Sequence, residues 1–129
     1  MKAYTDIEQS KKLAEILPIE SADMYYYTVN GDWEWYETPN VIERRDDLEE
    51  HAMPAWSLAA LLEILPDEII DDNGYNILIN IEKYDLKYKV TYFTDLNFSD
   101  RISTDEYENL VDACVEMILK LHEQNLLLN

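Results

Sequence analysis

Residues 75–93 read YNILINIEKYDLKYKVTYF, and two runs within this stretch alternate apolar with polar side chains. Such alternation is typical of half-buried β-strands. One face of the first run carries Tyr75, Ile77, Ile79 and Ile81, and one face of the second carries Tyr88, Val90 and Tyr92. The residues between the runs, EKYDLK, supply the turn, although no glycine fixes its register. The stretch therefore predicts an antiparallel hairpin.

A second hairpin is predicted upstream, where residues 23–37 read DMYYYTVNGDWEWYE. Asn30-Gly31 is the preferred pair for a two-residue type I′ turn, because both positions need a positive φ. A turn centred there pairs Thr28 with Trp33. Successive side chains of a strand point to opposite faces, so this pairing divides the aromatic residues into two sets.

The more apolar set of this upstream hairpin is expected to build the core, and it comprises Met24, Tyr26, Thr28, Trp33 and Trp35. The other set is expected to be half exposed, and it comprises Tyr25, Tyr27, Val29, Asp32, Glu34 and Tyr36. Its aromatic and acidic members are the predicted partner-binding residues, namely Tyr25, Tyr27, Asp32, Glu34 and Tyr36. A mixture of tyrosines and carboxylates favours a protein or a cation over an anion.

Three helices are predicted from apolar periodicity and end signals, and they span about residues 6–17, 55–65 and 104–125. The first and last begin with a capping box, a Ser or Thr followed three residues later by Glu; the pairs are Thr5 with Glu8 and Ser103 with Glu106. The middle helix, in PAWSLAALLEILP, is apolar almost all round, which indicates burial on more than one side. Trp56 is therefore expected to be a core residue.

The predicted order of elements is α-β-β-α-β-β-α, which is typical of an α+β fold. We expect a two-layer sandwich, in which three helices cover one face of a four-stranded antiparallel sheet made by the two hairpins. The 129 residues suit a single domain over 1–129 with one core. Residues 38–53 are charged and irregular, and they are predicted to form a surface segment.

The chain is strongly acidic, with 28 Asp and Glu against 10 Lys and Arg, a formal net charge of −18. The excess is spread along the chain, with −8 in residues 1–50, −6 in 51–100 and −4 in 101–129. A uniformly negative surface repels phosphate backbones and anionic lipid, which disfavours direct binding of nucleic acid. The charge serves solubility in the simplest interpretation, and imitates nucleic acid for a basic partner in a sharper one.

Motifs of catalysis and of cofactor binding are missing from the sequence. It contains no GxxxxGK, GxGxxG, GxSxG, HExxH or CxxC, and His51 and His122 lie far apart. Cys114 lies on the apolar stripe of the last helix and is expected to be buried. We therefore expect no enzyme activity, no cofactor and no metal. A single cysteine, no run of 18 apolar residues and no apolar segment in MKAYTDIEQS predict a cytoplasmic protein.

Three stretches, YTDIEQSKKLAEILPIESADMYY, PAWSLAALLEILP and VDACVEMILKLHE, together suggest a family. They resemble a family of small acidic proteins encoded by gut anaerobic bacteria and their mobile or phage-like elements, and the similarity covers nearly the whole chain. The family has no established activity, so the resemblance supplies no catalytic or binding residues. It implies a cytoplasmic bacterial accessory protein.

Three functions stay open from the sequence. The first is a non-catalytic accessory protein of a bacterial genome or a mobile element that binds another protein. The second is an acidic nucleic-acid mimic that inhibits a basic DNA-binding enzyme. The third is a small-molecule binder with a pocket between the helix over residues 55–65 and the sheet.

Overall fold

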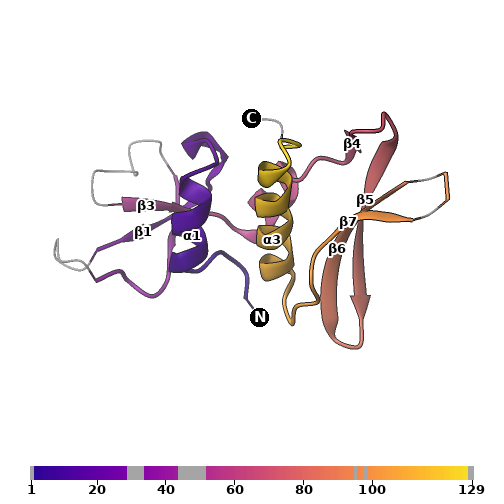
Figure 1. Ribbon diagram of the computed structural model, residues 1–129. Coiled ribbons are helices and arrows are strands. Elements are labelled where there is room, and N and C mark those ends of the chain that lie inside the picture. The colour runs from indigo at the N-terminus through magenta and orange to yellow at the C-terminus, as the bar shows by residue number, and fades with distance from the viewer. Residues whose placement is uncertain (1, 29–33, 44–51, 95, 98, 128–129) are drawn as a thin grey trace.

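The computed structural model describes residues 2–28, 34–43, 52–94, 96–97 and 99–127 (Figure 1). Over these residues it contains three α-helices, one 3-10 helix and seven strands. In chain order they are α1 (Ile7–Ala14), η1 (Ile19–Ser21), β1 (Met24–Tyr27), β2 (Asn40–Val41), β3 (Ala52–Ala55), α2 (Leu58–Ile64), β4 (Glu68–Ile70), β5 (Asn76–Tyr84), β6 (Lys87–Thr94), β7 (Asp100–Ser103) and α3 (Leu110–Glu123).

The strands of the described residues form two antiparallel sheets, in the orders β2-β1-β3 and β4-β5-β6-β7. The predicted α+β class is confirmed, but the prediction of one four-stranded sheet made by two hairpins is wrong. The reason lies in β1, which pairs with β3 over all four of its residues and so becomes the central strand of its own sheet. The other hairpin gains β4 and β7 as flanking strands instead.

The helices lie between the two sheets rather than on one face of a single sheet. Figure 1 shows α3 near the middle, with the three-stranded sheet and α1 on one side and the four-stranded sheet on the other. α1 packs against β3, α2 packs against α3, and α3 packs against β6. The predicted order of seven elements is accordingly replaced by the longer one given above.

One hydrophobic core joins the two sides of the molecule, and its centre is α3. Seven side chains of this helix are buried, namely Val111, Ala113, Cys114, Val115, Met117, Ile118 and Leu121. The same cluster contains Leu13 of α1, Trp56 and Ile77 of β5, all completely buried. Trp56 is thus a core residue, as predicted, although the most enclosed helix is α3 and not α2.

A smaller apolar cluster lies on the three-stranded sheet. Tyr26, Met53 and Ala55 form its buried centre, and half-buried Ile7, Met24 and Trp35 pack around them. The prediction that Tyr26 belongs to a core is confirmed, and its hydroxyl donates to the backbone oxygen of Thr5 at 2.7 Å.

The first helix begins one residue later than its predicted capping box indicates. Asp6 is the N-cap, because its Oδ1 accepts from the Gln9 backbone N–H at 2.8 Å while Gln9 Oε1 accepts from Asp6 N–H at 3.1 Å. Thr5 is buried instead, and its Oγ1 accepts from the Trp56 backbone N–H at 3.1 Å. A tertiary contact thus displaces the local one.

The other two helices begin later than predicted, because the residues before them form strands or bridges instead. Residues 52–55 form β3, and α2 is capped by Ser57, whose Oγ accepts from the Ala60 N–H at 3.2 Å. The predicted box of Ser103 and Glu106 is wrong, since Ser103 ends β7. The chain continues beside β6 through a bridge between Tyr88 and Tyr107, and α3 begins only after the N-cap Asn109.

The hairpin predicted over residues 75–93 is present and is the longest ladder in the described structure. Its register runs from Ile77 opposite Thr94 to Tyr84 opposite Lys87. Only Asp85 and Leu86 remain in the turn, with φ of 52° and 62°. Two consecutive positive φ angles are the signature of a type I′ turn, here built without glycine.

Candidate interaction surface

The predicted partner-binding residues do not form one exposed surface. Tyr25 is only 9 % exposed, whereas Tyr27 is half-buried and Tyr36 is 51 % exposed. Glu34 is exposed as well, and Asp32 lies outside the described residues. The expectation that all these side chains share a half-exposed face is therefore wrong for Tyr25.

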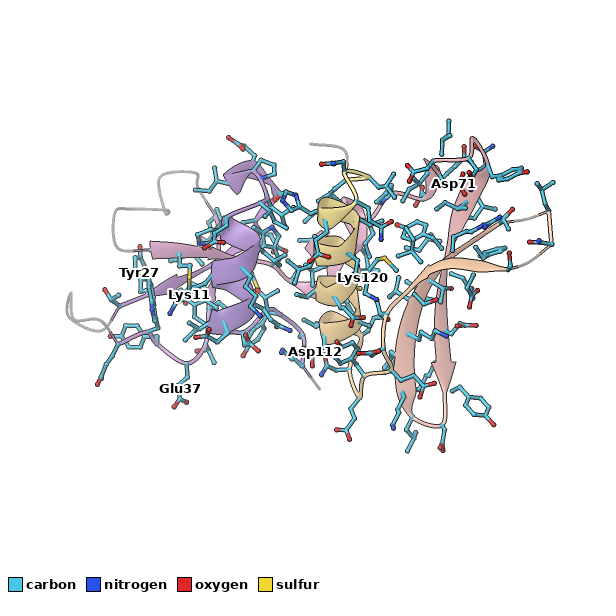
Figure 2. The ribbon with its side chains drawn as sticks, in the orientation of Figure 1. Lys11, Tyr27, Glu37, Asp71, Asp112 and Lys120 are labelled. Atoms are coloured by element: carbon cyan, nitrogen blue, oxygen red, sulfur yellow. The ribbon has the colours of Figure 1, made fainter. Side chains whose placement is uncertain are left out.

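The position of β1 explains the burial of Tyr25. As the central strand, β1 has neighbours on both edges, with Tyr25 opposite Asn40 on one side and Pro54 on the other. The Tyr25 and Tyr27 rings meet edge to face at 4.8 Å between centroids. Figure 2 shows Tyr27 on the outer side of the three-stranded sheet, away from α3.

The expected pairing of the upstream hairpin is also different. Thr28 forms a bridge with Trp35 instead of Trp33, and the Tyr36 backbone N–H donates to Tyr27 O at 2.9 Å. The described part of the segment after β1 thus returns beside it irregularly, through this bridge and the two pairs of β1 with β2, and not as one continuous second strand.

Exposed apolar side chains gather mainly on the other sheet. Of the ten large hydrophobic residues that are exposed in the described structure, six lie within residues 70–96: Ile70, Tyr75, Ile81, Tyr84, Leu86 and Leu96. The two largest exposed fractions, 83 % and 79 %, belong to Tyr84 and Leu86 at the turn of the β5–β6 hairpin. Ile70, Tyr75 and Leu96 lie at the other end of the β5–β6 ladder, so Tyr84 and Leu86 make the turn the leading candidate for contact with a partner.

Three lysines surround these two apolar side chains. We call Lys83, Tyr84, Leu86, Lys87 and Lys89 together the hairpin tip. A surface depression of about 460 Å³ is lined by three of its lysines, by Tyr84 and by two acids, Glu82 and Glu106. None of the three lysines makes an ion pair within 4.0 Å to another described residue. Lys83 Nζ lies 5.5 Å from the Tyr88 ring centroid, in cation–π range.

The sequence contains a signal for the hairpin tip that its interpretation as a turn overlooked. Residues 83–89 read KYDLKYK, which places three lysines within seven positions of a chain that has only ten basic residues. A local excess of bases in so acidic a protein, interleaved with Tyr and Leu, is typical of a contact surface rather than of a solvated turn.

A polar cluster joins α1 and the residues before it to the N-terminal end of α3. Asp112 Oδ1 accepts from Lys2 Nζ at 2.7 Å and from Gln9 Nε2 at 2.6 Å, and its Oδ2 accepts from Asn109 Nδ2 at 2.8 Å. Burial opposes ionisation of Asp112, but these hydrogen bonds outweigh it and lower the pKa of the carboxyl. Figure 2 shows Asp112 at the N-terminal end of α3. We call Lys2, Gln9, Asn109 and Asp112 the joint between α1 and α3, because their hydrogen bonds connect the two helices.

Cys114 lies in the core and is not exposed. Burial raises the pKa of Cys114 to about 12, so the thiol is neutral and enclosed, and its predicted burial is confirmed. Within the described part of the chain, no three His, Cys, Asp or Glu side chains are grouped so that they could hold a metal ion. None of the described helices is long and apolar enough to cross a membrane.

No family model, curated protein or solved structure matches the chain. The hairpin tip is therefore interpreted from its own geometry.

Proposed function

We propose that the protein is a non-catalytic accessory module that binds another protein through the hairpin tip. The observation that carries the proposal is the exposure of Tyr84 and Leu86 beside each other at the end of a two-stranded ladder. Full burial of such a side chain stabilises a complex by about 1.5–3 kcal/mol. Tyrosine is also one of the residues in which protein interfaces are enriched.

The construction of the hairpin supports the same proposal. The ladder closes on the pair Tyr84 and Lys87, and the bridge between Tyr88 and Tyr107 ties β6 to the segment that precedes α3. A contact surface that is ordered before binding loses less conformational entropy when a partner arrives. The tip therefore meets the main energetic requirement of a binding hairpin.

The wider role proposed for the module is that of a bacterial accessory protein in the cytoplasm, encoded by a bacterial genome or a mobile element. The resemblance of three stretches to small acidic proteins of gut anaerobes supports it, as does the single buried cysteine. The two alternative functions have weaker support. A nucleic-acid mimic needs a continuous acidic face, whereas Lys89 lies directly opposite Glu82. A small-molecule pocket was expected between α2 and the sheet, but α2 packs against α3 instead.

The proposal is tested by affinity capture from a lysate of the source organism, with matched variants. Tyr84→Ala combined with Leu86→Ser removes the apolar part of the tip. The control, Tyr36→Ala with Val41→Ser, removes side chains that are also exposed, at 51 % and 64 %, from the three-stranded sheet. We expect one reproducible protein to be captured by the wild type and by the control, and to be lost with the tip variant.

Two outcomes would overturn the proposal. Capture that survives the tip variant but fails with the control would move the site to the three-stranded sheet. The absence of any reproducible partner would argue against a protein-binding function as a whole.

A further inference from the structure

We infer that the hairpin tip recognises an acidic polypeptide segment of its partner, with Lys87 and Lys89 contacting carboxylates. The inference rests on the proposed function and adds the chemistry of the partner to it.

The pairing state of the lysines is the first argument. The chain has 28 acidic residues, and some of its lysines pair with them. Lys2, for example, pairs with Asp6 at 3.0 Å and with Asp112 at 2.7 Å. Lys87 and Lys89 make no such pair with a described residue, whereas Lys83 Nζ lies over the Tyr88 ring. Contact of Lys87 and Lys89 with a partner would therefore break no ion pair among the described residues.

The spacing of the lysines is the second argument. Lys87 and Lys89 are two positions apart on β6, so they lie on the same face of the strand and roughly 7 Å apart. Val90 and Ile77 point to the opposite, buried face. An extended peptide with an acid at every second position presents carboxylates at the same interval of roughly 7 Å. Tyr84 is opposite Lys87 in the ladder and so lies on the same face, where it can contact the aliphatic part of the acidic side chains.

The charges around the tip favour a polypeptide over a nucleic acid. Glu82 and Glu106 line the same depression, and Asp85 lies in the turn. A phosphate backbone carries a charge about every 3.4 Å along each strand and extends past the tip, where it would meet these acids and the −18 of the whole chain. A peptide can place its fewer carboxylates against the lysines alone.

The inference is tested with labelled peptides and fluorescence anisotropy. The probe is a short peptide in which Glu alternates with Ser and Leu, and the comparison peptide has Gln in place of each Glu. Lys87→Gln with Lys89→Gln removes two charges from the tip. Lys11→Gln with Lys12→Gln removes the same charge from α1 and is the matched control.

We expect the Glu peptide to bind, the Gln peptide to bind at least about fivefold more weakly, and binding to weaken as salt is raised. The tip variant should reduce the affinity for the Glu peptide about fivefold to tenfold, and the α1 control should change it less than twofold. Circular dichroism would verify that both variants stay folded.

Three results would overturn the inference. A short DNA duplex that binds more tightly than the Glu peptide, and depends on Lys87 and Lys89, would assign the tip to nucleic acid. Self-association of the wild type that the tip variant abolishes would assign it to a second copy of the chain. Equal losses of affinity in the tip variant and the α1 control would mean that binding depends on net charge and not on the tip.

The captured partner separates this inference from the function on which it rests. If Tyr84→Ala with Leu86→Ser abolishes capture while Lys87→Gln with Lys89→Gln leaves it unchanged, the protein-binding function stands and the acidic partner is wrong. Loss of capture in both variants supports both proposals.

Discussion

The two segments with the strongest β signals, residues 23–37 and 75–93, have opposite outcomes. The first contains Asn30-Gly31, yet its described return pairing is irregular and consists of a bridge between Thr28 and Trp35 and the two pairs of β1 with β2. The second has no glycine, yet it forms the longest described ladder and turns on Asp85 and Leu86. Sustained alternation of side chains was therefore a better guide to the hairpin than the preferred turn pair.

The burial of neighbouring residues shows why the segments differ. In β1, Tyr25 and Tyr26 are consecutive and both are buried, so neither face of the strand is left to solvent. A strand of that kind suits the centre of a sheet, and β1 pairs with β2 on one edge and with β3 on the other. In β5, Ile77 is buried while its neighbour Asn76 is exposed, as expected for a strand with one wet face.

The largest expected effect tests the core that joins these two regions. Trp56→Ala should reduce the free energy of unfolding by about 3–5 kcal/mol, because the indole is completely buried and its Nε1 donates to Ser21 Oγ at 3.0 Å. Urea unfolding measures the loss, with Leu62→Ala on the exposed side of α2 as the control. A loss below about 1 kcal/mol would mean that the two regions do not share this core.

A smaller effect is expected at the joint between α1 and α3. Asp112→Ala should cost about 1–3 kcal/mol, since it removes an acceptor of three side-chain hydrogen bonds, one of them from Lys2. Chemical denaturation at neutral pH measures this loss. Glu108→Ala, at the same end of α3, is a suitable control.

The same carboxyl should make stability depend on acid. The pKa of Asp112 is lowered in the folded state from its ordinary value of 3.8, so its stabilisation is complete above that value and is lost as the pH falls through the folded pKa. Denaturation series from pH 6 down to pH 2 should therefore fall less steeply for Asp112→Asn than for the wild type. Parallel curves would show that the joint is not coupled to folding.

A change of about 0.5–1.5 kcal/mol is expected within the smaller cluster. Tyr26→Phe removes the hydroxyl that donates to Thr5 O and leaves that oxygen without this donor. If the two regions open independently, hydrogen exchange should accelerate in β1 and β3 and stay unchanged in β5 and β6. Uniform acceleration would instead make the molecule one cooperative unit.

The smallest effect is expected when the Asn-Gly pair of the first segment is introduced at the turn of the second. Replacing Asp85-Leu86 by Asn-Gly should stabilise the protein by up to about 1 kcal/mol, because Leu86 has a φ of 62° that costs a branched side chain energy. Thermal unfolding measures the gain, and Asp85→Asn alone separates the two positions. The same variant removes Leu86 from the tip, so greater stability should accompany weaker capture of the partner.

Local patterns were sufficient to predict the fold class, the hairpin over residues 75–93 and the burial of Trp56 and Cys114. They failed where a distant segment took a local group, as when the Trp56 N–H took the hydroxyl of Thr5 and moved the cap to Asp6. They also failed at Ser103, which paired in β7 instead of starting a helix. The split into two sheets depends on the pairing of β1 with β3, which neither strand shows in its own sequence.

The candidate site was hard to predict for a related reason. Composition drew attention to the aromatic residues of 23–37, but exposure depends on which strand becomes central, and Tyr25 was lost to the interior. The exposure of Tyr84 and Leu86 and the ion pairing of the lysines depend on the tertiary structure, which local sequence patterns do not describe. Of the predicted residues, Tyr36 and Glu34 are exposed as expected.

The central position of α3 has a consequence for synthesis of the chain. Ribosomes deliver both sheets before residues 110–123, so the strands emerge while the helix that separates them is still missing. Until α3 is synthesised, Trp56 and Ile77 expose apolar surface to solvent or to chaperones. The nascent chain is expected to complete its fold only when the last turn of α3 has left the exit tunnel, and its high negative charge would keep the waiting segments from aggregating.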